Sequence, residues 1–538
     1  MKPRDGRVGT RVLQSLLLLV IVQPGSMVCA AEMLSGGSGR QPSLAPLGRA
    51  DGRSVAREID RLLQEHYRHK KIKPTPRADE ATRLRRLKLD LTGRVPTLAE
   101  LRAFRADSSA DKYDTAARQL VSGPEFSWYF GTVLDEMIQG RLAGNEAFVN
   151  YLRRALQLGK GWDAIFREVL LGPWEAEGER PASLFLDRRA KDLDRLTVDV
   201  AQSFFGVDIS CARCHNHPLV KDWKQDHYYG LAAFFNRTTS TKGKVSEKLD
   251  GEVMFVTRGG KQRTAPMMFL SGRKVDEPKQ EAKPEKQPQT RFSRREQLVR
   301  IALEDKVFLS RAAVNRMWAY FFGRGLVEPV DQMHSGNPAS VPPLLDWLAA
   351  DFVASGYNIP RLVTAITLSR AYQFDSVWPG DTLPPEPGHF AVAHLRPLSP
   401  RQLAMSLLVA LGDDAKFGKP EERLRALEKP AAELMTAFDP RTADFQSSTR
   451  EALFVSNSEA VRKVMAADGN NLAARLMAIR DNKELLETAF LTIFSRPPNE
   501  VERVELTKWL RQQDGNRRTM CEDLVWTLAA SAEFRFHR

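Results

Sequence analysis

One stretch of the sequence combines residue types and a spacing that could do chemistry. It reads Cys-Ala-Arg-Cys-His-Asn-His-Pro from Cys211 to Pro218. Two thiols three residues apart lie on one side of a helical turn, where they can add to the two vinyl groups of a haem. The imidazole of His215, directly after Cys214, is then placed to bind the iron. The pattern therefore predicts a haem c held by Cys211, Cys214 and His215.

The second axial position of such a haem has no ligand fixed by the motif. His217 is only two residues from His215 and cannot easily reach the opposite face of the same iron. A methionine in this position would raise the reduction potential relative to a histidine. The more distant candidates are His227, Met254, Met267 and Met268.

A zinc ion is an alternative occupant of the same stretch. Two sulfurs and two nitrogens would complete a tetrahedral site. They would come from Cys211, Cys214, His217 and His227. The pair formed by His215 and His217 is itself typical of metal sites. A variant with one open position would activate a water for hydrolysis, with Asp222 or Asp226 orienting the histidines.

A third alternative needs no metal. In an oxidising compartment free thiols are usually paired, so Cys211 and Cys214 could form a disulfide in an exported scaffold. Cys521 lies in an apolar helical stretch, and we expect it to be buried and to take no part in this chemistry.

The N-terminus predicts an export signal. Arg7 and Arg11 precede an apolar run from Val12 to Val22, and Val28-Cys29-Ala30 ends in a small residue of the kind found at cleavage sites. The run is too short to span a bilayer. We therefore expect residues 1–30 to be a signal peptide, and the mature chain to be periplasmic or secreted with no membrane span.

Composition places the chain among ordinary globular proteins. Its 538 residues are too many for one core, and 42% hydrophobic and 27% charged residues are typical values. The net charge of +13 is spread along the chain, and no basic stripe alternates with aromatics. This pattern argues against a nucleic-acid partner and leaves an anionic polymer, such as an extracellular polysaccharide, as one kind of partner.

Helices must position the motif, because apolar residues recur at helical spacing over most of the chain and Gly or Pro ends the runs. Thr97 with Glu100 predicts a capping box. The segment from 192 to 205 is predicted to be a helix that leads through Gly206 into the motif. The aromatic segment 226–235 after the motif could form a haem wall or plain core. Other predicted helices are 55–67, 80–91, 110–121, 124–139, 146–158, 162–171, 295–303, 310–322, 342–355, 360–372, 400–411, 484–494, 500–513 and 520–533; residues 412–450 are expected to be less regular.

A region of different character divides the helical sequence. Residues 252–257 have strand composition, Gly259-Gly260 forms a turn and 266–270 is the expected return strand. Residues 273–294 are a charged, Pro-rich linker. We therefore predict a mainly α fold of two helical domains, with one small β-hairpin inserted before the linker. The predicted order is signal peptide 1–30, flexible leader 31–53, cytochrome-like domain 54–272, linker 273–294 and C-terminal domain 295–538.

Several longer motifs carry a family resemblance. They are Lys88-Leu89-Asp90-Leu91-Thr92-Gly93, Phe205-Gly206-Val207 leading into Cys211 to Pro218, Val314-Asn315-Arg316-Met317-Trp318, Phe322-Gly323-Arg324-Gly325-Leu326-Val327 and Ser495-Arg496-Pro497-Pro498. Through them the chain resembles planctomycete-type secreted proteins that join a cytochrome-like domain of unknown function, numbered 1549, to a second one, numbered 1553. The resemblance implies the domain order and little mechanism, because no activity is established for the family. Unlike many relatives, this chain lacks an additional cytochrome c domain.

The sequence thus predicts an exported c-type haem protein with an electron-transfer or redox role in the cell envelope and a redox partner protein. A zinc protein, with a structural or hydrolytic site, and a disulfide-stabilised, polysaccharide-associated scaffold are the alternatives. Polar residues within the second-half motifs, such as Asn315, Arg316 and Asp346, are expected to order helix ends. Whether the protein is an enzyme is left open.

Overall fold

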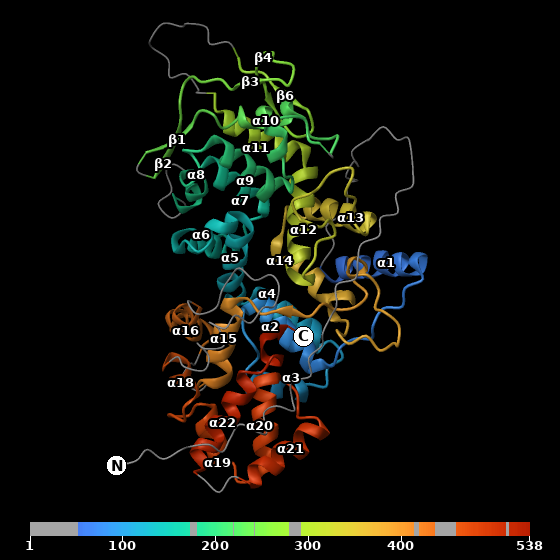
Figure 1. Cartoon of the computed structure of the whole chain (residues 1–538), viewed down its shortest axis with the longest axis vertical. Helices are drawn as coiled ribbons and strands as arrows, with labels where there is room; N and C mark the ends of the chain where they lie inside the picture. The colour runs from blue at the N-terminus through green and yellow to red at the C-terminus, as the bar shows by residue number, and fades with distance from the viewer. Residues whose placement is uncertain are drawn as a thin grey trace, which may run out of the picture. The chain divides into compact units, whose positions relative to one another are not determined.

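The computed structural model (Figure 1) describes residues 52–172, 180–218, 220–241, 243–278, 292–413, 419–435, 459–512 and 516–537. The predicted signal peptide and nearly all of the predicted leader lie outside these ranges, as do residues 279–291 of the predicted linker. Where it is described, the chain is mainly α-helical, as predicted. None of the described helices combines the length and apolar composition that a bilayer crossing requires.

Most helices of the first half lie close to their predicted positions, but the helices over 184–187 and 225–232 were not predicted. The Thr97 side chain accepts the Glu100 N–H and the Glu100 side chain accepts the Thr97 N–H, which confirms the capping box. The helices are α1 (Gly52–Lys70), α2 (Glu80–Thr92), α3 (Leu98–Ala106), α4 (Lys112–Ser122), α5 (Pro124–Gln139), α6 (Glu146–Gln157), α7 (Trp162–Leu171), α8 (Leu184–Asp187), α9 (Leu193–Phe205) and α10 (Gln225–Ala232).

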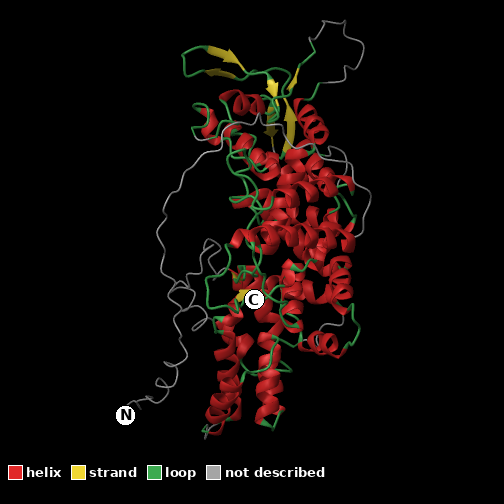
Figure 2. Cartoon of the chain, turned by 90° about the vertical axis from the view of Figure 1, so that its right-hand side faces the viewer, coloured by secondary structure: helices red, strands yellow, loops and turns green. Residues whose placement is uncertain are grey.

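The region after α10 holds three small strand pairs, where one hairpin was predicted. The pairs are β1 (Thr238–Thr241) with β2 (Lys244–Glu247), β3 (Met254–Val256) with β4 (Gln262–Thr264), and β5 (Met267–Met268) with β6 (Lys274–Val275). The tight turn at Gly260 pairs β3 with the residues that follow the turn directly, so the predicted return strand 266–270 instead contributes β5 to the third pair. β1 and β2 were missed because their Thr- and Lys-rich sequences carry no apolar alternation. Figure 2 shows the pairs gathered in one region, where β5 contacts α10 and β1 and β2 contact α8.

The second half is helical, with one more strand pair near its end. The prediction that residues 412–450 are irregular is wrong for α16, whose buried Leu424, Leu427, Ala431 and Leu434 keep helical spacing between charged neighbours. The helices are α11 (Arg294–Asp305), α12 (Val307–Phe322), α13 (Pro342–Ala354), α14 (Ile359–Leu368), α15 (Pro400–Leu411), α16 (Pro420–Met435), α18 (Glu459–Met465), α19 (Leu472–Ala478), α20 (Asn482–Phe494), α21 (Glu500–Arg511) and α22 (Arg517–Ala529). The short strands β7 (Arg396–Pro397) and β8 (Phe536–His537) pair near the C-terminus.

The buried apolar side chains form two clusters, and the border between them does not coincide with residues 273–294. The first cluster runs from Val55 to Ala391 with Leu491, and it includes the contacts of α1 with α14 and of α9 with α12. The second joins the helices after residue 398 to Leu89 and Val95 from the first half. Segments on both sides of the predicted linker therefore share each core.

The turn after α2 requires glycine. Gly93 has a φ of 73°, and a Cβ there would lie 2.4 Å from a carbon of the Tyr129 ring. The turn aims the fully buried Arg94 between Glu100 and Glu125, to which its guanidinium donates at 2.9–3.0 Å. The pairing satisfies a charge that would otherwise be costly to bury.

A second buried network centres on Asp90 of α2. Its carboxylate, which is fully buried, accepts from Arg396 at 3.1 Å, from the Tyr372 hydroxyl at 2.8 Å and from Nε2 of His537 at 3.0 Å. The Tyr320 hydroxyl donates to the Asp90 carbonyl at 2.8 Å. Burial alone would raise the pKa of Asp90, but Arg396 and His537 outweigh burial and lower it. The network ties α2 to α12, to the turn after α14 and to the β7–β8 pair.

The burial of His537 makes the stability of the folded chain sensitive to acid. It lowers the pKa of His537 from 6.5 to about 4, although Asp90 acts in the opposite direction. At a pH between these two pKa values, His537 takes up a proton in the unfolded chain but not in the folded chain. The folded state is therefore stabilised above the unfolded pKa, and this contribution is lost as the pH falls toward the folded pKa.

We expect His537→Gln to remove part of the pH dependence of stability. In the wild type, His537 should lower the free energy of unfolding by about 3 kcal/mol between about pH 7 and pH 4. Glutamine keeps a donor and does not titrate, so the variant should be less stable at neutral pH but less sensitive to acid. Urea denaturation at several pH values measures both effects, with His69→Gln on the exposed surface as the control. An unchanged pH slope in His537→Gln would contradict the assignment.

Candidate functional site

The cysteine motif begins with one turn of 3₁₀ helix, which a hydrogen bond to Asp208 anchors. Ser210–Arg213 form this turn, and the Asp208 carboxylate accepts the Ser210 N–H at 2.9 Å. Ala212 points inward and is fully buried, while Cys211 and Cys214 are exposed and are not joined by a disulfide. Both cysteines are therefore exposed, one within this turn and one directly after it.

Side chains of α10 hold the backbone of the motif. The Gln225 amide donates to the Cys214 carbonyl at 3.1 Å and to the Arg213 carbonyl at 3.4 Å. The Gln225 N–H donates to the Asn216 side chain at 3.1 Å, and the Tyr229 hydroxyl donates to the Arg213 carbonyl at 2.9 Å. These contacts fix the carbonyls of the motif and leave its thiols outside the hydrogen-bond network that they form.

His215 presents a nitrogen that suits a metal. Its ring is exposed, and its Nδ1 lies 2.7 Å from the Asn216 carbonyl oxygen. A carbonyl only accepts, so Nδ1 carries the proton and Nε2 keeps its lone pair. Metal-binding histidines commonly have this arrangement, in which the second nitrogen donates to a carbonyl and orients the ring.

His217 and His227 have the opposite arrangement. Nδ1 of His217 accepts the Val220 N–H at 3.0 Å, and Nδ1 of His227 accepts the Lys224 N–H at 3.1 Å. A neutral ring of this kind carries its proton on Nε2, so neither nitrogen offers a lone pair to a metal. Burial lowers the pKa of His227, which favours this neutral form.

The four predicted zinc ligands are not brought together. Within the described ranges, no three His, Cys, Asp or Glu side chains lie close enough to hold one ion. Asp222 accepts from the backbone N–H and the hydroxyl of Ser335 at 2.7 and 2.6 Å, and Asp226 pairs with Arg263 at 3.0 Å. The two carboxylates thus lie near His227 but take Ser335 and Arg263 as their partners, and neither forms a hydrogen bond with the histidines it was predicted to orient among the contacts of the described residues.

The candidate methionine ligands lie elsewhere. Phe255 of β3 is buried and stacks on Tyr229 at 4.3 Å, so Met254, which is 61% exposed, points to the other face of the strand. Met267 and Met268 are buried, and Met268 packs against the backbone of Gly230. The structure brings none of these sulfurs to His215.

The aromatic segment after the motif forms mostly core. Trp223, Tyr228, Phe234 and Phe235 are buried. Tyr229 is the exception, because it is half-buried near Cys214; burial raises its pKa, although Arg213 acts in the opposite direction. The Tyr229 ring is therefore the aromatic surface of this segment that adjoins the motif.

Sequence reasoning missed a loop of the second half that braces the motif. The Asp208 N–H donates to the Asp331 carbonyl at 2.7 Å, and Ser335 binds Asp222. Burial lowers the pKa of His334, with Asp222 raising it and His217 lowering it, so this loop also carries a histidine near the motif. No spacing in the sequence connects residues 331–335 to residues 208–222.

The polar residues of the second-half motifs act structurally, as expected. The buried Asn315 side chain donates to the Val327 carbonyl and accepts its N–H, each at 2.8 Å. Arg316 donates to the Gln202 carbonyl at 2.6 Å and so joins α12 to α9, while Asp346 pairs with Arg311.

Two family models match the chain. Residues 58–240 match PSCyt2, a protein of unknown function (DUF1549), and residues 294–430 match PSD1, a protein of unknown function (DUF1553). The chain belongs to the proteins that carry these two domains in this order. The motif of Cys211 to Pro218 lies within the PSCyt2 match, and the bracing loop lies within the PSD1 match. No curated protein and no solved structure matches the chain.

The exposure of the cysteines predicts their reactivity. In reduced full-length protein made without haem attachment and carrying Cys29→Ser, we expect two thiols to react at once with Ellman's reagent. The third, Cys521, is fully buried, and an opening that costs about 4 kcal/mol would slow its reaction about a thousandfold.

Cys521→Ala is the control, and it should remove only the slow thiol. Protein purified without reductant that shows no fast thiol would indicate a disulfide between Cys211 and Cys214. A single fast thiol in fully reduced protein would contradict the outward placement of both.

Proposed function

We propose that this chain is an exported c-type haem protein that transfers electrons in the cell envelope. The observation that carries the proposal is the 2.7 Å hydrogen bond between Nδ1 of the exposed His215 and the Asn216 carbonyl, which leaves the lone pair on Nε2. The neighbouring Cys211 and Cys214 are free and exposed, which supports the same assignment. Export rests on residues 1–30.

The residues of the motif have separate roles in this proposal. Cys211 and Cys214 would hold the haem through two thioether bonds, each formed by addition of an S–H across one vinyl group with no net oxidation. Nε2 of His215 would hold the iron, while the hydrogen bond from its Nδ1 to the Asn216 carbonyl fixes the ring orientation. The bound haem would supply one-electron chemistry. Gln225 and Tyr229 keep the motif backbone in place.

The proposal also covers the second ligand, which the sequence left open. Nδ1 of His227 accepts a backbone N–H, and Met254 lies on the face of its strand opposite Phe255. Met267 and Met268 are buried in the core. We therefore assign no second protein ligand to the haem.

Covalent haem attachment tests the proposal directly. The full chain is produced with a cytochrome maturation system, and haem is measured by pyridine haemochrome and by haem staining of denatured protein. Wild type should hold one haem per chain, and Cys214→Ala should lower covalent haem at least about tenfold. Because His217 and Cys521 have no role in attachment here, His217→Ala and Cys521→Ala should match the wild type.

His215→Ala separates ligation from attachment. It should change the Soret band of any haem that remains attached, because the iron loses its axial nitrogen. Colourless wild-type protein would overturn the proposal: bound zinc would then support the metal alternative, and no metal with paired thiols would support the scaffold. Covalent haem that persists unchanged in Cys214→Ala would contradict the assigned attachment.

A further inference from the structure

A loop with an apolar tip lies beside the end of α1 (Figure 1). Its two ends meet at Thr75, whose N–H donates to the Ala391 carbonyl at 2.9 Å and whose hydroxyl donates to the Asp375 carbonyl at 2.8 Å. Between these ends, Leu383 is 91% exposed. Residues 376–390 therefore form a surface loop that holds an apolar side chain in water.

The loop restrains its own tip. The Trp378 indole N–H donates to the Thr382 carbonyl at 2.8 Å and closes the segment that precedes Leu383. Val377, at the other end of this segment, is also exposed. Proline fixes one backbone dihedral angle wherever it occurs, and the loop has prolines at 379, 384, 385 and 387. The apolar side chains are thus carried on a restrained backbone, which lowers the entropy that binding would cost.

Two contacts hold the loop against α1. The Tyr67 hydroxyl donates to the Phe390 carbonyl at 2.8 Å. Nε2 of His66 lies 2.9 Å from Nδ1 of His389, so the two rings share a hydrogen bond. The loop and the last turn of α1 therefore form one continuous surface.

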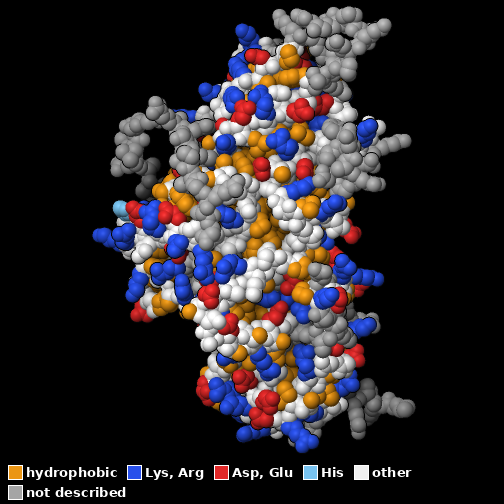
Figure 3. Space-filling model, turned by 180° about the vertical axis from the view of Figure 1, so that it is seen from behind, with side chains coloured by type: hydrophobic (Ala, Val, Ile, Leu, Met, Phe, Trp, Pro, Cys, Tyr) orange, Lys and Arg blue, Asp and Glu red, His pale blue; other side chains and the backbone are white. Residues whose placement is uncertain are grey.

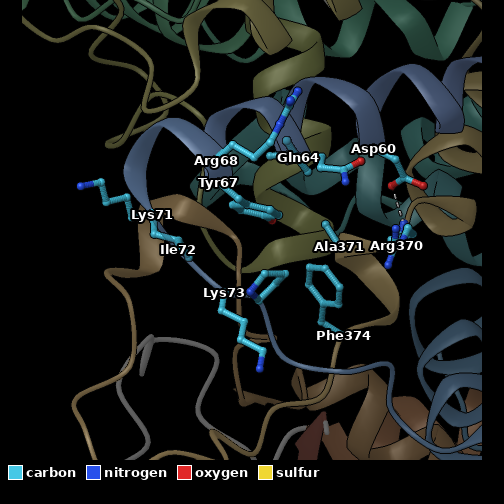
Figure 4. Close-up of a pocket in the computed structure, with 12 residues that line it drawn as sticks. Asp60, Gln64, Tyr67, Arg68, Lys71, Ile72, Lys73, Arg370, Ala371 and Phe374 are labelled. Atoms are coloured by element: carbon cyan, nitrogen blue, oxygen red, sulfur yellow. Dashed lines mark hydrogen bonds between the residues drawn. The ribbon is translucent and has the colours of Figure 1, made fainter.

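Four exposed cations extend this surface, and among the described residues none of them forms an ion pair with a carboxylate; they are Arg68, Lys70, Lys71 and Lys73. The helix dipole favours basic residues in the last turn of α1, but Lys71 and Lys73 follow the helix. Figure 4 shows the side chains of both directed away from the Tyr67 ring. In the space-filling view, Lys and Arg side chains gather over the region that α1 forms (Figure 3). Positive charge and exposed apolar side chains thus occur on the same surface.

We propose that this surface docks the chain on a lipid bilayer that contains anionic phospholipids. The cations attract the lipid phosphates, and each Lys or Arg near such a bilayer strengthens binding about fivefold. They outnumber the two carboxylates of the loop, Asp381 and Glu386. Leu383 and Val377 enter the apolar edge of the bilayer, where the Trp378 indole lies at the level of the headgroups.

A bilayer suits this surface better than an anionic polysaccharide does. A dissolved polysaccharide would pair with the cations but offers no apolar phase to Leu383. A bilayer offers phosphate groups directly above hydrocarbon, so it accommodates the cations and the apolar tip together. The surface shares no residue with the cysteine motif, and docking does not depend on the proposed haem.

Cosedimentation with lipid vesicles tests the proposal. The chain is used in its predicted exported form, from Ala31 onward, so that the apolar run from Val12 to Val22 does not itself bind lipid. Vesicles of equal parts phosphatidylcholine and phosphatidylglycerol should bind it at least about tenfold more tightly than vesicles of phosphatidylcholine alone, at about 0.1 M salt. Equal affinity for both vesicles, or no binding to either, would overturn the proposal. Binding to alginate without binding to the vesicles would overturn it in favour of a polysaccharide.

A lysine double variant locates the charged part of the surface. Lys71→Gln combined with Lys73→Gln should weaken binding to the anionic vesicles at least about tenfold, because two charges are lost. The matched control is Lys244→Gln combined with Lys261→Gln, which removes two exposed lysines from the region of the strand pairs. This control should bind nearly as tightly as the wild type.

Leu383→Ser tests the apolar part separately. It should weaken binding to the anionic vesicles about fivefold or more, because the leucine no longer leaves water. Leu249→Ser, which changes a leucine that is 68% exposed outside this surface, is the control and should have little effect. All of these side chains are exposed, and circular dichroism checks that the variants keep their fold. Unchanged vesicle binding in either Leu383→Ser or the double variant at positions 71 and 73 would contradict the proposed surface.

Discussion

The buried carboxylate of Asp90 is the constraint on which the arrangement of the chain depends. A fully buried negative charge is tolerated only when its oxygens are paired, and the partners of the Asp90 carboxylate come from the turn after α14, from β7 and from the last strand. Tyr320 of α12 adds a hydrogen bond to the Asp90 backbone carbonyl. All of these partners follow residue 294, whereas Asp90 lies in α2. The charge of Asp90 is therefore satisfied only when these later segments are folded against α2. The segments that match the two family models thus depend on each other for their folding.

The same interdependence reaches the cysteine motif. Its inner side rests on Asp208, whose backbone binds the 331–335 loop, and Asp222 is held by Ser335 of the same loop. Arg316 adds a further bond from α12 to α9. The PSD1 region thus supports the geometry of a motif that belongs to the PSCyt2 region, and this gives the second domain a physical role in the site.

Hydrogen bonds to the backbone separate three histidines that look alike in the sequence. A carbonyl beside His215 leaves Nε2 with its lone pair, whereas N–H groups beside His217 and His227 use the acceptor nitrogen of each ring. Residues only two positions apart therefore differ in what they can bind. This difference singles out His215 among the three and argues against a cluster of zinc ligands within the described residues.

The sequence by itself determined the mainly helical fold, the capping box at Thr97 and the family, because periodicity, caps and short motifs are local properties of the chain. It also placed Gly206 at the end of the helix before the motif. It could not determine the register of the three strand pairs, α16, or the place of Met254, since burial against distant segments decided them. Only the tertiary structure decided that Asp90 meets His537, that Ser335 holds Asp222 and that the loop 376–390 lies beside α1. Such contacts join residues more than a hundred positions apart, and they arise from the shared burial of charge and apolar surface, which no local pattern encodes.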